Sequence, residues 1–363
     1  MAEKQLMKGN EALSEGAVRA GCRFFAGYPI TPQNEVPEYM SWRLPQVGGA
    51  FIQSESEVAA INVIYGAAAT GVRSMTSSSS PGISLKQEGI SYCAGADLPF
   101  LIANVMRGGP GLGNIAGAQG DYFQSTRGGG HGDYRLYVMA PNCVQEMFDF
   151  PKRCYETAYK YRIPSMILAD GTLGQMMEGV EIKWPEIDVK TIEKPKWSLG
   201  INTERRERRM VGSYDLRDGM LEKMVLERVK RYKEIEEKEV LWEEKMTEDA
   251  EIILVAYGIS SRVAFAGCKM AREKGIKAGL LRPITLWPFP KKRLAELAPK
   301  TKNFLAVEMS LGQMVEDVRL AVNGATNVNL FARPGGSPIF AEEVYKAIED
   351  IVKKGAKEYA TVK

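Results

Sequence analysis

The feature that most constrains the fold is a nine-residue segment, residues 98–106, in which apolar side chains follow one another almost without interruption. A strand with one face in water alternates apolar and polar residues, so a nearly continuous run is expected of a central parallel strand covered on both faces. Shorter strand-like segments alternate with helix-like ones at residues 22–28, 72–76, 136–140 and 164–169. This alternation predicts an α/β fold built on a parallel sheet.

A second α/β unit is predicted after a change in composition. Residues 204–245 are rich in alternating Arg, Lys and Glu, a pattern typical of one or two exposed helices that link domains. Strand-like segments then return at residues 252–257, 278–282, 304–308 and 328–331. We therefore predict two parallel-sheet α/β domains, at residues 1–195 and 248–363, joined by a charged helical connector at residues 196–247.

The composition excludes several classes of partner. With 48 basic and 45 acidic residues the net charge is +3, so no strong field attracts nucleic acid or a membrane surface. No segment reaches the ~18 consecutive apolar residues of a membrane span, and the first residues lack the apolar core of a secretory signal. The five cysteines form no C-x-x-C pair, which fits reduced thiols rather than disulfides or a metal site. We expect a cytoplasmic protein that binds no metal through its own side chains.

The first candidate binding element is the loop Tyr28-Pro-Ile-Thr-Pro32, which follows a predicted strand. Open α/β sheets bind ligands beyond the carboxyl ends of their strands, so the location is favourable. The prolines would hold the loop open beside the Thr31 hydroxyl. From the pattern alone, however, a structural turn is the better explanation.

Glu57 stands directly before a predicted helix at residues 58–71. The apolar residues of this helix extend nearly all round it, so we expect it to be buried on every side. An acidic residue in the first turn is already favoured by the helix dipole. A carboxylate at an apolar strand-end cleft would also form a strong hydrogen bond to a protonated ring nitrogen. On composition alone Glu55, two residues earlier, is a rival candidate.

Three further features are weaker. Arg107 ends the predicted central strand, where a guanidinium can grip a carboxylate through two hydrogen bonds, although a solvated arginine is commoner. His131, the only histidine, either moves protons near neutral pH or donates a hydrogen bond within its loop. The serines before Gly82 are compatible with an anion at a helix N-terminus. The glycines around Gly113 form no dinucleotide-binding motif, because no G-x-G-x-x-G lies directly between a strand and a helix.

Taken together, these segments resemble the alpha-type subunit of 2-oxoacid:ferredoxin oxidoreductases, and most closely the 2-oxoisovalerate (3-methyl-2-oxobutanoate) type. The resemblance to the family's pyrimidine-binding domain rests on the order and spacing of Tyr28-Pro-Ile-Thr-Pro32, Gln53-Ser-Glu-Ser-Glu-Val-Ala-Ala60, Thr76-Ser-Ser-Ser-Ser-Pro-Gly82 and Asn104-Val-Met-Arg107. His131-Gly-Asp133 and Ile167-Leu-Ala-Asp170 are similar as well. Leu281-Arg-Pro-Ile-Thr-Leu-Trp-Pro288 and Glu308-Met-Ser-Leu-Gly-Gln313 resemble its transketolase C-terminal-like domain, so the resemblance covers nearly the whole chain.

The resemblance implies a thiamine-diphosphate-binding fold in residues 1–195, where the pyrimidine half of the cofactor binds, and a transketolase C-terminal-like domain in residues 248–363. It also implies that Glu57 is the catalytic glutamate that bonds the pyrimidine ring. Placing that role on Glu55 would require an insertion inside the following helix. The remaining implied roles are cofactor contacts from Tyr28 and Ile30, 2-oxoacid contacts from Thr31 and Arg107, and an auxiliary role for His131.

Two motifs of the family are missing from this chain. The Gly-Asp-Gly segment that holds Mg²⁺ and diphosphate is absent, because Gly120-Asp121 and Gly132-Asp133 are each followed by tyrosine. No cysteine set for an iron–sulfur cluster is present either. The resemblance therefore implies a hetero-oligomer. In it, a pyrophosphate-binding beta-type subunit holds Mg²⁺ and diphosphate. Gamma-type and ferredoxin-like delta-type subunits accompany it, with [4Fe-4S] clusters on the partners.

The implied reaction is the CoA-dependent oxidative decarboxylation of a 2-oxoacid to its acyl-CoA, with electrons passed to ferredoxin. Members of the family that act on 2-oxoglutarate carry Pro-Ser-Thr-Gly where this chain has Pro110-Gly-Leu-Gly113. The apolar Leu112 is more similar to the branched-chain type. Three alternatives stay open: 2-oxoglutarate or pyruvate as the substrate, a thiamine-dependent enzyme without electron transfer, and a non-catalytic ligand-binding subunit.

Overall fold

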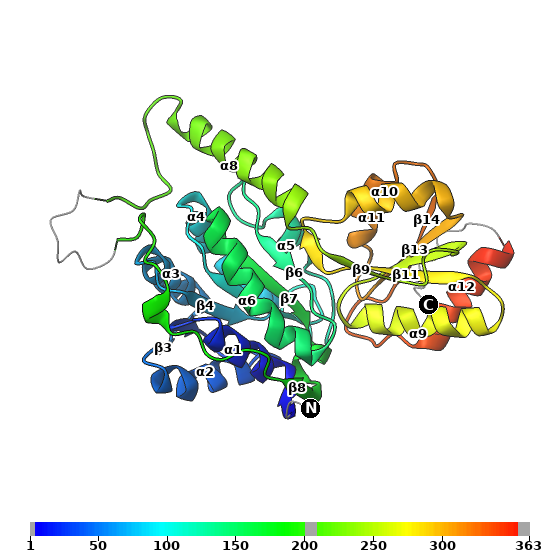
Figure 1. Ribbon diagram of the computed structural model, residues 1–363, viewed down its shortest axis with the longest axis horizontal. Helices are drawn as coiled ribbons and strands as arrows, with labels where there is room; N and C mark the ends of the chain where they lie inside the picture. Colours follow the sequence, from blue (N-terminus) through cyan, green and yellow to red (C-terminus); the bar gives the residue numbers. More distant parts are fainter. Residues whose placement is uncertain (1–3, 200–208, 355–363) are drawn as a thin grey trace.

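The predicted central strand, β5 (Leu101–Met106), lies in the middle of a seven-stranded sheet. The computed structural model describes residues 4–199 and 209–354 (Figure 1). All six residues of β5 are buried, as the apolar run predicts, and β4 (Ser74–Ser78) and β7 (Ser165–Asp170) run parallel to it on either side. The strand order is β12-β6-β7-β5-β4-β2-β3. Its outer members are β2 (Phe24–Gly27), β3 (Ala50–Gln53), β6 (Tyr137–Met139) and β12 (Thr285–Trp287).

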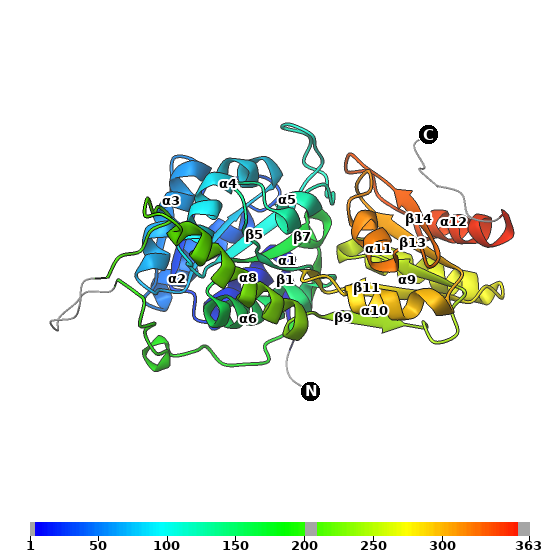
Figure 2. The same ribbon diagram turned by 90° about the horizontal axis from the view of Figure 1, so that it is seen from above.

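Two pairs of helices cover the two faces of this sheet. Figure 2 shows the sheet between these helix pairs. One pair is α1 (Gly9–Arg19) with α6 (Val144–Tyr161), and the other is α3 (Glu57–Ala69) with α4 (Ser80–Gly95). The shorter elements of this part are α2 (Glu35–Gln46), α5 (Tyr122–Arg127), α7 (Gly171–Gln175), a 3₁₀ turn (Val189–Thr191) and the antiparallel pair β1 (Lys4–Lys8) and β8 (Met177–Glu181). The predicted parallel α/β architecture is confirmed.

The expectation that residues 58–71 are buried on every side is wrong. Along α3, Ala60, Ile61 and Ile64 are buried, but Val58 is 44% exposed and Asn62 is exposed on the same side. Apolar composition shows that a helix face avoids water, but not whether its own chain covers that face. No described part of this chain covers the Val58 side of α3.

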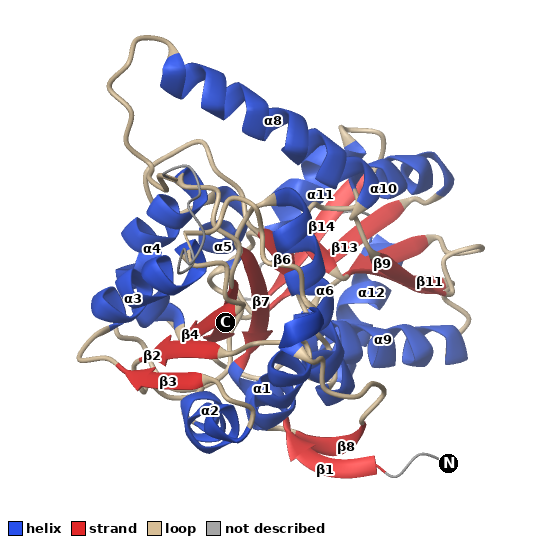
Figure 3. Cartoon of the chain, turned by 60° about the vertical axis from the view of Figure 1, so that its left-hand side comes forward, coloured by secondary structure: helices blue, strands red, loops and turns tan. Residues whose placement is uncertain are grey.

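The charged connector contains one long helix, α8 (Met220–Lys238), which extends beyond the body of the protein at its N-terminal end (Figures 1 and 3). Only Arg228 and Ile235 of this helix are buried. Arg228 and Arg231 both contact Asp97, at 2.9 and 2.6 Å, and thereby fasten the helix to the first domain. Residues 200–208 of the predicted connector lie outside the described residues.

The second sheet has five strands in the order β14-β13-β10-β11-β9. Its strands are β9 (Trp242–Lys245), β10 (Ile252–Val255), β11 (Ala278–Pro283), β13 (Asn303–Glu308) and β14 (Asn327–Ala332), all parallel except β9. The helices of this part are α9 (Gly258–Glu273), α10 (Lys291–Leu297), α11 (Met314–Val322) and α12 (Ala341–Lys354), with a 3₁₀ turn at Ala298–Lys300. In the described part of the chain no helix has both the length and the apolar character needed to cross a membrane.

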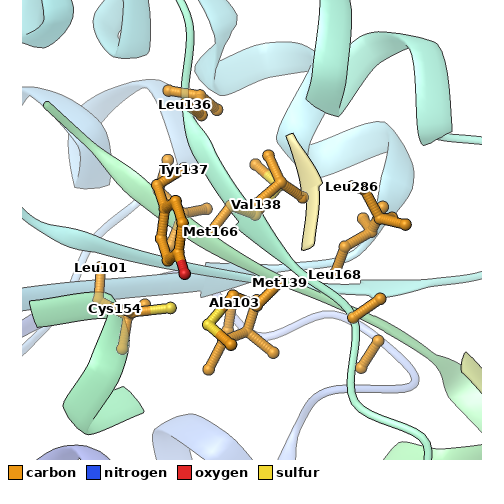
Figure 4. Close-up of a cluster of buried hydrophobic side chains, with 14 of the residues drawn as sticks. Leu101, Ala103, Leu136, Tyr137, Val138, Met139, Cys154, Met166, Leu168 and Leu286 are labelled. Atoms are coloured by element: carbon orange, nitrogen blue, oxygen red, sulfur yellow. The ribbon is translucent and has the colours of Figure 1, made fainter. Parts of the chain in front are cut away.

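The second half of the chain contributes one strand to the first sheet. β12 comes from the predicted second domain, yet it pairs antiparallel with β6 of the first sheet, with Thr285 opposite Met139. Leu286 consequently lies in the same buried cluster as Val138 and Leu168 (Figure 4). β9, from the predicted connector, pairs with β11 of the second sheet. Strand pairing thus crosses the boundaries expected at residues 195/196 and 247/248, and that division stays a prediction.

Candidate functional site

The candidate site lies along the edge of the first sheet where its parallel strands end. Because β2, β3, β4 and β5 run in the same direction, their carboxyl ends meet at one edge. The segments that leave these ends are the Tyr28–Pro32 loop, residues 54–57, the serines at 79 and 80, and Arg107. The topology therefore brings together Thr31, Glu57 and Arg107, which are far apart in the sequence.

The loop after β2 is fixed by hydrogen bonds to three surrounding side chains. The Pro32 carbonyl accepts bonds from Asn10 Nδ2 at 2.8 Å and from Gln175 Nε2 at 2.9 Å. Gln33 Nε2 donates to the Tyr28 carbonyl at 3.2 Å. The side chains of Tyr28 and Thr31 stay exposed, and Ile30 is half-buried. The loop is therefore held rigidly while it presents side chains outward, as a binding loop requires.

Glu57 is the first residue of α3 and is only 6% exposed. The helix is capped by Ser56, whose hydroxyl accepts a hydrogen bond from the Ala59 amide at 3.1 Å, so the Glu57 carboxylate is not needed as a cap. That carboxylate accepts no hydrogen bond from the described part of the chain. It faces Gly82 of α4: a Cβ atom at Gly82 would lie 2.6 Å from Glu57 Oε1 and 2.1 Å from Ser78 Oγ. Glu55, by contrast, is exposed.

Arg107 is 7% exposed, and its guanidinium is held by two backbone carbonyls rather than by a carboxylate. Nη1 donates to the Thr31 carbonyl at 2.9 Å and Nη2 to the Leu112 carbonyl at 2.8 Å. The buried Nε has no hydrogen-bond partner among the described residues. A nearly buried cation with an unused donor, and no ion pair within the described part of the chain, is a favourable place for a carboxylate ligand.

A network of hydrogen bonds that we did not predict holds the backbone amide of Arg107. Ser80 Oγ accepts a bond from the Arg107 amide at 3.1 Å and donates to Asp121 Oδ2 at 2.6 Å. Asn104 Nδ2 donates to the same carboxylate oxygen at 2.9 Å. Burial raises the pKa of Asp121. The serine-rich segment and Asn104 were visible in the sequence, but nothing local indicated that Asp121 would reach them.

Lys86, also not predicted, lies inside the protein next to Glu57. Lys86 Nζ donates to Thr76 Oγ1 at 2.5 Å and to the Ser77 carbonyl at 3.0 Å, and the side chain is fully buried. Desolvation lowers the pKa of Lys86 to about 7, although the charge of Glu57 acts in the opposite direction. Lys86 lies one helical turn after Gly82 on α4, so both face α3.

His131 lies apart from these residues. It is exposed and lines a cavity of about 700 Å³ with Ser91 and Tyr92 of α4 and with Arg228 of α8. Ser91 is eleven residues along α4 from Ser80, which corresponds to roughly 16 Å at the helical rise. The auxiliary role of His131 therefore stays a prediction with no geometric support at the Arg107 site.

The fold and the site together define a two-domain α/β protein with a ligand site at the carboxyl ends of its first sheet. Residues 15–262 match the family described as pyruvate flavodoxin/ferredoxin oxidoreductase, thiamine diphosphate-binding. Residues 250–344 match core domain II of pyruvate:ferredoxin oxidoreductase. The chain therefore belongs to the 2-oxoacid:ferredoxin oxidoreductase family, whose members are oxidoreductases, and it carries the family's thiamine-diphosphate-binding domain.

Individual relatives agree with this assignment. The chain is 50% identical over 347 residues to the ketoisovalerate oxidoreductase subunit VorB of Methanothermobacter thermautotrophicus, covering 96% of this chain and 97% of that one. It is 36% identical over 375 residues to the 2-oxoglutarate synthase subunit KorA of the same organism, covering 96% and 99%. The fold matches that of a 2-oxoglutarate:ferredoxin oxidoreductase from Magnetococcus marinus with a TM-score of 0.82 and 24% identity, over 97% of this chain and 66% of the other.

The residues at the site fit the cofactor that this family uses. Thiamine diphosphate would need an acidic partner for its pyrimidine ring, and Glu57 is a buried carboxylate that still has open acceptor positions. Gly82 allows α4 to approach that carboxylate closely, since a Cβ at this position would lie 2.6 Å from Glu57 Oε1. Ser54, Ser78 and Ser79 add buried hydroxyls that have no partner among the described residues. Among those residues no group of three or more His, Cys, Asp or Glu side chains could hold a metal ion.

Proposed function

We propose that this chain is the subunit that binds the pyrimidine half of thiamine diphosphate in a cytoplasmic 2-oxoisovalerate:ferredoxin oxidoreductase. The observation that carries the proposal is Glu57, a buried carboxylate that accepts no hydrogen bond from the described chain and packs against Gly82. Burial without a hydrogen-bond partner is costly for a carboxylate, so such a group is expected to have a ligand.

In this proposal Glu57 accepts a hydrogen bond from the protonated pyrimidine nitrogen and so holds the proton that cofactor activation needs. Bound thiamine diphosphate supplies the carbanion chemistry of the reaction. Tyr28 and Ile30, from the rigid loop after β2, contact the same ring. Because that loop is held by Asn10 and Gln175, these contacts cost little ordering on binding.

Arg107 and Thr31 orient the 2-oxoacid. The guanidinium takes the substrate carboxylate, and the exposed Thr31 hydroxyl belongs to the same residue whose carbonyl accepts the bond from Arg107 Nη1. In the overall reaction the bond between the carboxylate and carbonyl carbons breaks with loss of carbon dioxide. A thioester to CoA forms, and two electrons pass through [4Fe-4S] clusters of partner subunits to ferredoxin.

A branched-chain substrate is supported by two observations. Identity is 50% to the ketoisovalerate oxidoreductase subunit and 36% to the 2-oxoglutarate synthase subunit of one organism. The loop beside Arg107 presents Leu112, which is 78% exposed, and Ile115, but no cation for a second substrate carboxylate. These features favour 2-oxoisovalerate over 2-oxoglutarate.

The proposal requires partner subunits. The exposed side of α3, where Val58 lies one turn from Asn62, supports an interface beside Glu57 with a beta-type subunit that holds Mg²⁺ and the diphosphate. Gamma-type and ferredoxin-like delta-type subunits would complete the electron path. A thiamine enzyme without electron transfer is the weaker alternative, because a split-gene transketolase shares only the fold, with a TM-score of 0.59 and 14% identity.

The test uses the native complex purified with its partner subunits. Reduction of a viologen dye is measured with CoA and 2-oxoisovalerate, 2-oxoglutarate or pyruvate, and thiamine diphosphate affinity is measured by titration calorimetry. We expect turnover with 2-oxoisovalerate. Glu57→Gln should remove activity and weaken cofactor binding, because an amide cannot replace the carboxylate, whereas the matched control Glu55→Gln should behave like the wild type. Full activity of Glu57→Gln would refute the role of Glu57.

A further inference from the structure

The loop between Arg107 and Gly117 is closed by hydrogen bonds within the first domain, including one from the Asn114 amide to the Gly108 carbonyl at 2.9 Å, and it also has a hydrogen bond to the second domain. Arg107 and Gly117 face each other in an antiparallel bridge, and the Gly108 amide donates to the Ala116 carbonyl at 2.9 Å. Residues 109–116 are all exposed. An exposed glycine-rich loop has little packing to fix its conformation, so each of its few hydrogen bonds carries weight.

The tip of this loop supports the substrate site directly. Arg107 Nη2 donates to the Leu112 carbonyl at 2.8 Å, so one of the two carbonyls that hold the guanidinium lies in the loop. If the tip moves, the guanidinium loses half of its support. The position of Leu112 therefore bears on how well Arg107 is aimed.

Asn114 connects the loop to the second domain. Its Nδ2 donates to the Gly335 carbonyl at 2.9 Å, and its Oδ1 accepts the Ala116 amide at 3.0 Å. The amide group is enclosed by glycines: a Cβ at Gly108 would lie 2.5 Å from Asn114 Oδ1, and one at Gly336 would lie 3.0 Å from it and 2.7 Å from the Ala116 Cβ. Gly336 also has φ +80, which disfavours any side chain there.

We propose that Asn114 is a positioning residue through which the loop after β14 of the second domain holds the Leu112 carbonyl, and thus Arg107, in place for the substrate. The proposal rests on the function proposed above for Arg107. If Asn114 has this role, the second domain contributes to substrate binding. It does so indirectly, because no described residue of the second domain forms a hydrogen bond with the Arg107 side chain.

The test compares variants from both domains in the reconstituted complex. Asn114→Ala removes the link from the first domain, and Gly336→Ala displaces it from the second without adding charge. Loss of one such hydrogen bond should raise KM for 2-oxoisovalerate about three- to tenfold, with a smaller change in kcat. Thiamine diphosphate affinity should not change, and hydrogen exchange of residues 108–116 should become faster. The matched control is Asn327→Ala, which truncates an exposed asparagine at the start of β14 and should match the wild type.

Arg107→Lys in the same assay separates this inference from the function it rests on. If Arg107→Lys raises KM while Asn114→Ala and Gly336→Ala behave like Asn327→Ala, the positioning role is wrong and the substrate role of Arg107 stands. If Arg107→Lys leaves KM unchanged, the substrate role itself fails. If Asn114→Ala weakens thiamine diphosphate binding as much as it raises KM, Asn114 supports the fold generally and the proposal is refuted.

Discussion

Replacing the buried Lys86 with methionine should stabilise the protein in acid and not in alkali. Desolvation lowers the pKa of Lys86 from the ordinary 10.5 to about 7, a difference that corresponds to about 5 kcal/mol of folding free energy. Above pH 10.5 the lysine is neutral in both states and this cost is absent. As the pH falls from 10.5 to 7 the unfolded chain binds the proton and the folded chain does not, so the cost grows. Below pH 7 it is constant.

The substitution also removes two hydrogen bonds, from Lys86 Nζ to the Thr76 hydroxyl and the Ser77 carbonyl, which contribute about 1 kcal/mol each. We therefore expect Lys86→Met to raise the free energy of unfolding by about 3 kcal/mol at pH 6 and to lower it by about 1 kcal/mol at pH 10. Urea denaturation of the full-length chain at the two pH values measures both.

Lys233→Met, on the exposed side of α8, is the matched control and should change the free energy of unfolding little at either pH. The reasoning is refuted if the effect of Lys86→Met is the same at pH 6 and pH 10. That result would mean that Lys86 remains equally charged in the folded and unfolded chain, with Glu57 compensating its charge fully.

Two further substitutions test the packing around the site and between the domains. Gly82→Ala should weaken thiamine diphosphate binding at least about tenfold in calorimetry, because its Cβ would lie 2.6 Å from Glu57 Oε1. Gly66→Ala, with open space around it, should not weaken binding. Equal affinity of the two variants would contradict the proposed role of the Glu57 carboxylate in binding the cofactor. Tyr122→Phe should destabilise the chain by about 1–3 kcal/mol in urea, because the buried Tyr122 hydroxyl donates to Asp317 of the second domain at 2.6 Å. An unchanged midpoint would show that this bond adds nothing.

The sequence predicted the parts of the fold that depend on local pattern. The apolar run at residues 98–106 identified the central strand, and the order of strands and helices identified a parallel sheet. The carboxyl-end rule marked the Tyr28–Pro32 loop as a favourable place for a ligand, and in the structure the segments that carry Thr31, Glu57 and Arg107 leave the same edge of the sheet. Burial also separates Glu57 from the exposed Glu55, which composition alone did not.

The features that the sequence did not predict depend on contacts between distant segments. Asp121 reaches Ser80 and Asn104 only after the sheet has formed. Lys86 gives no local sign of burial, because its position on α4 becomes interior only when α3 packs against that side. The predicted burial of α3 on all sides was wrong for a related reason. Hydropathy indicates that a helix face is apolar, but it does not indicate whether the same chain covers that face.

The pairing of β12 with the first sheet has a consequence for folding during biosynthesis. As the chain leaves the ribosome, β6 is complete long before Thr285–Trp287 is made, so one edge of the first sheet waits with unpaired backbone groups. Domains usually fold one after another during translation, but here the first can close only when a segment of the second has emerged. A gene division inside the connector would separate β6 from the strand that seals it. The two chains would then have to associate before β12 could pair with β6 and complete the first sheet.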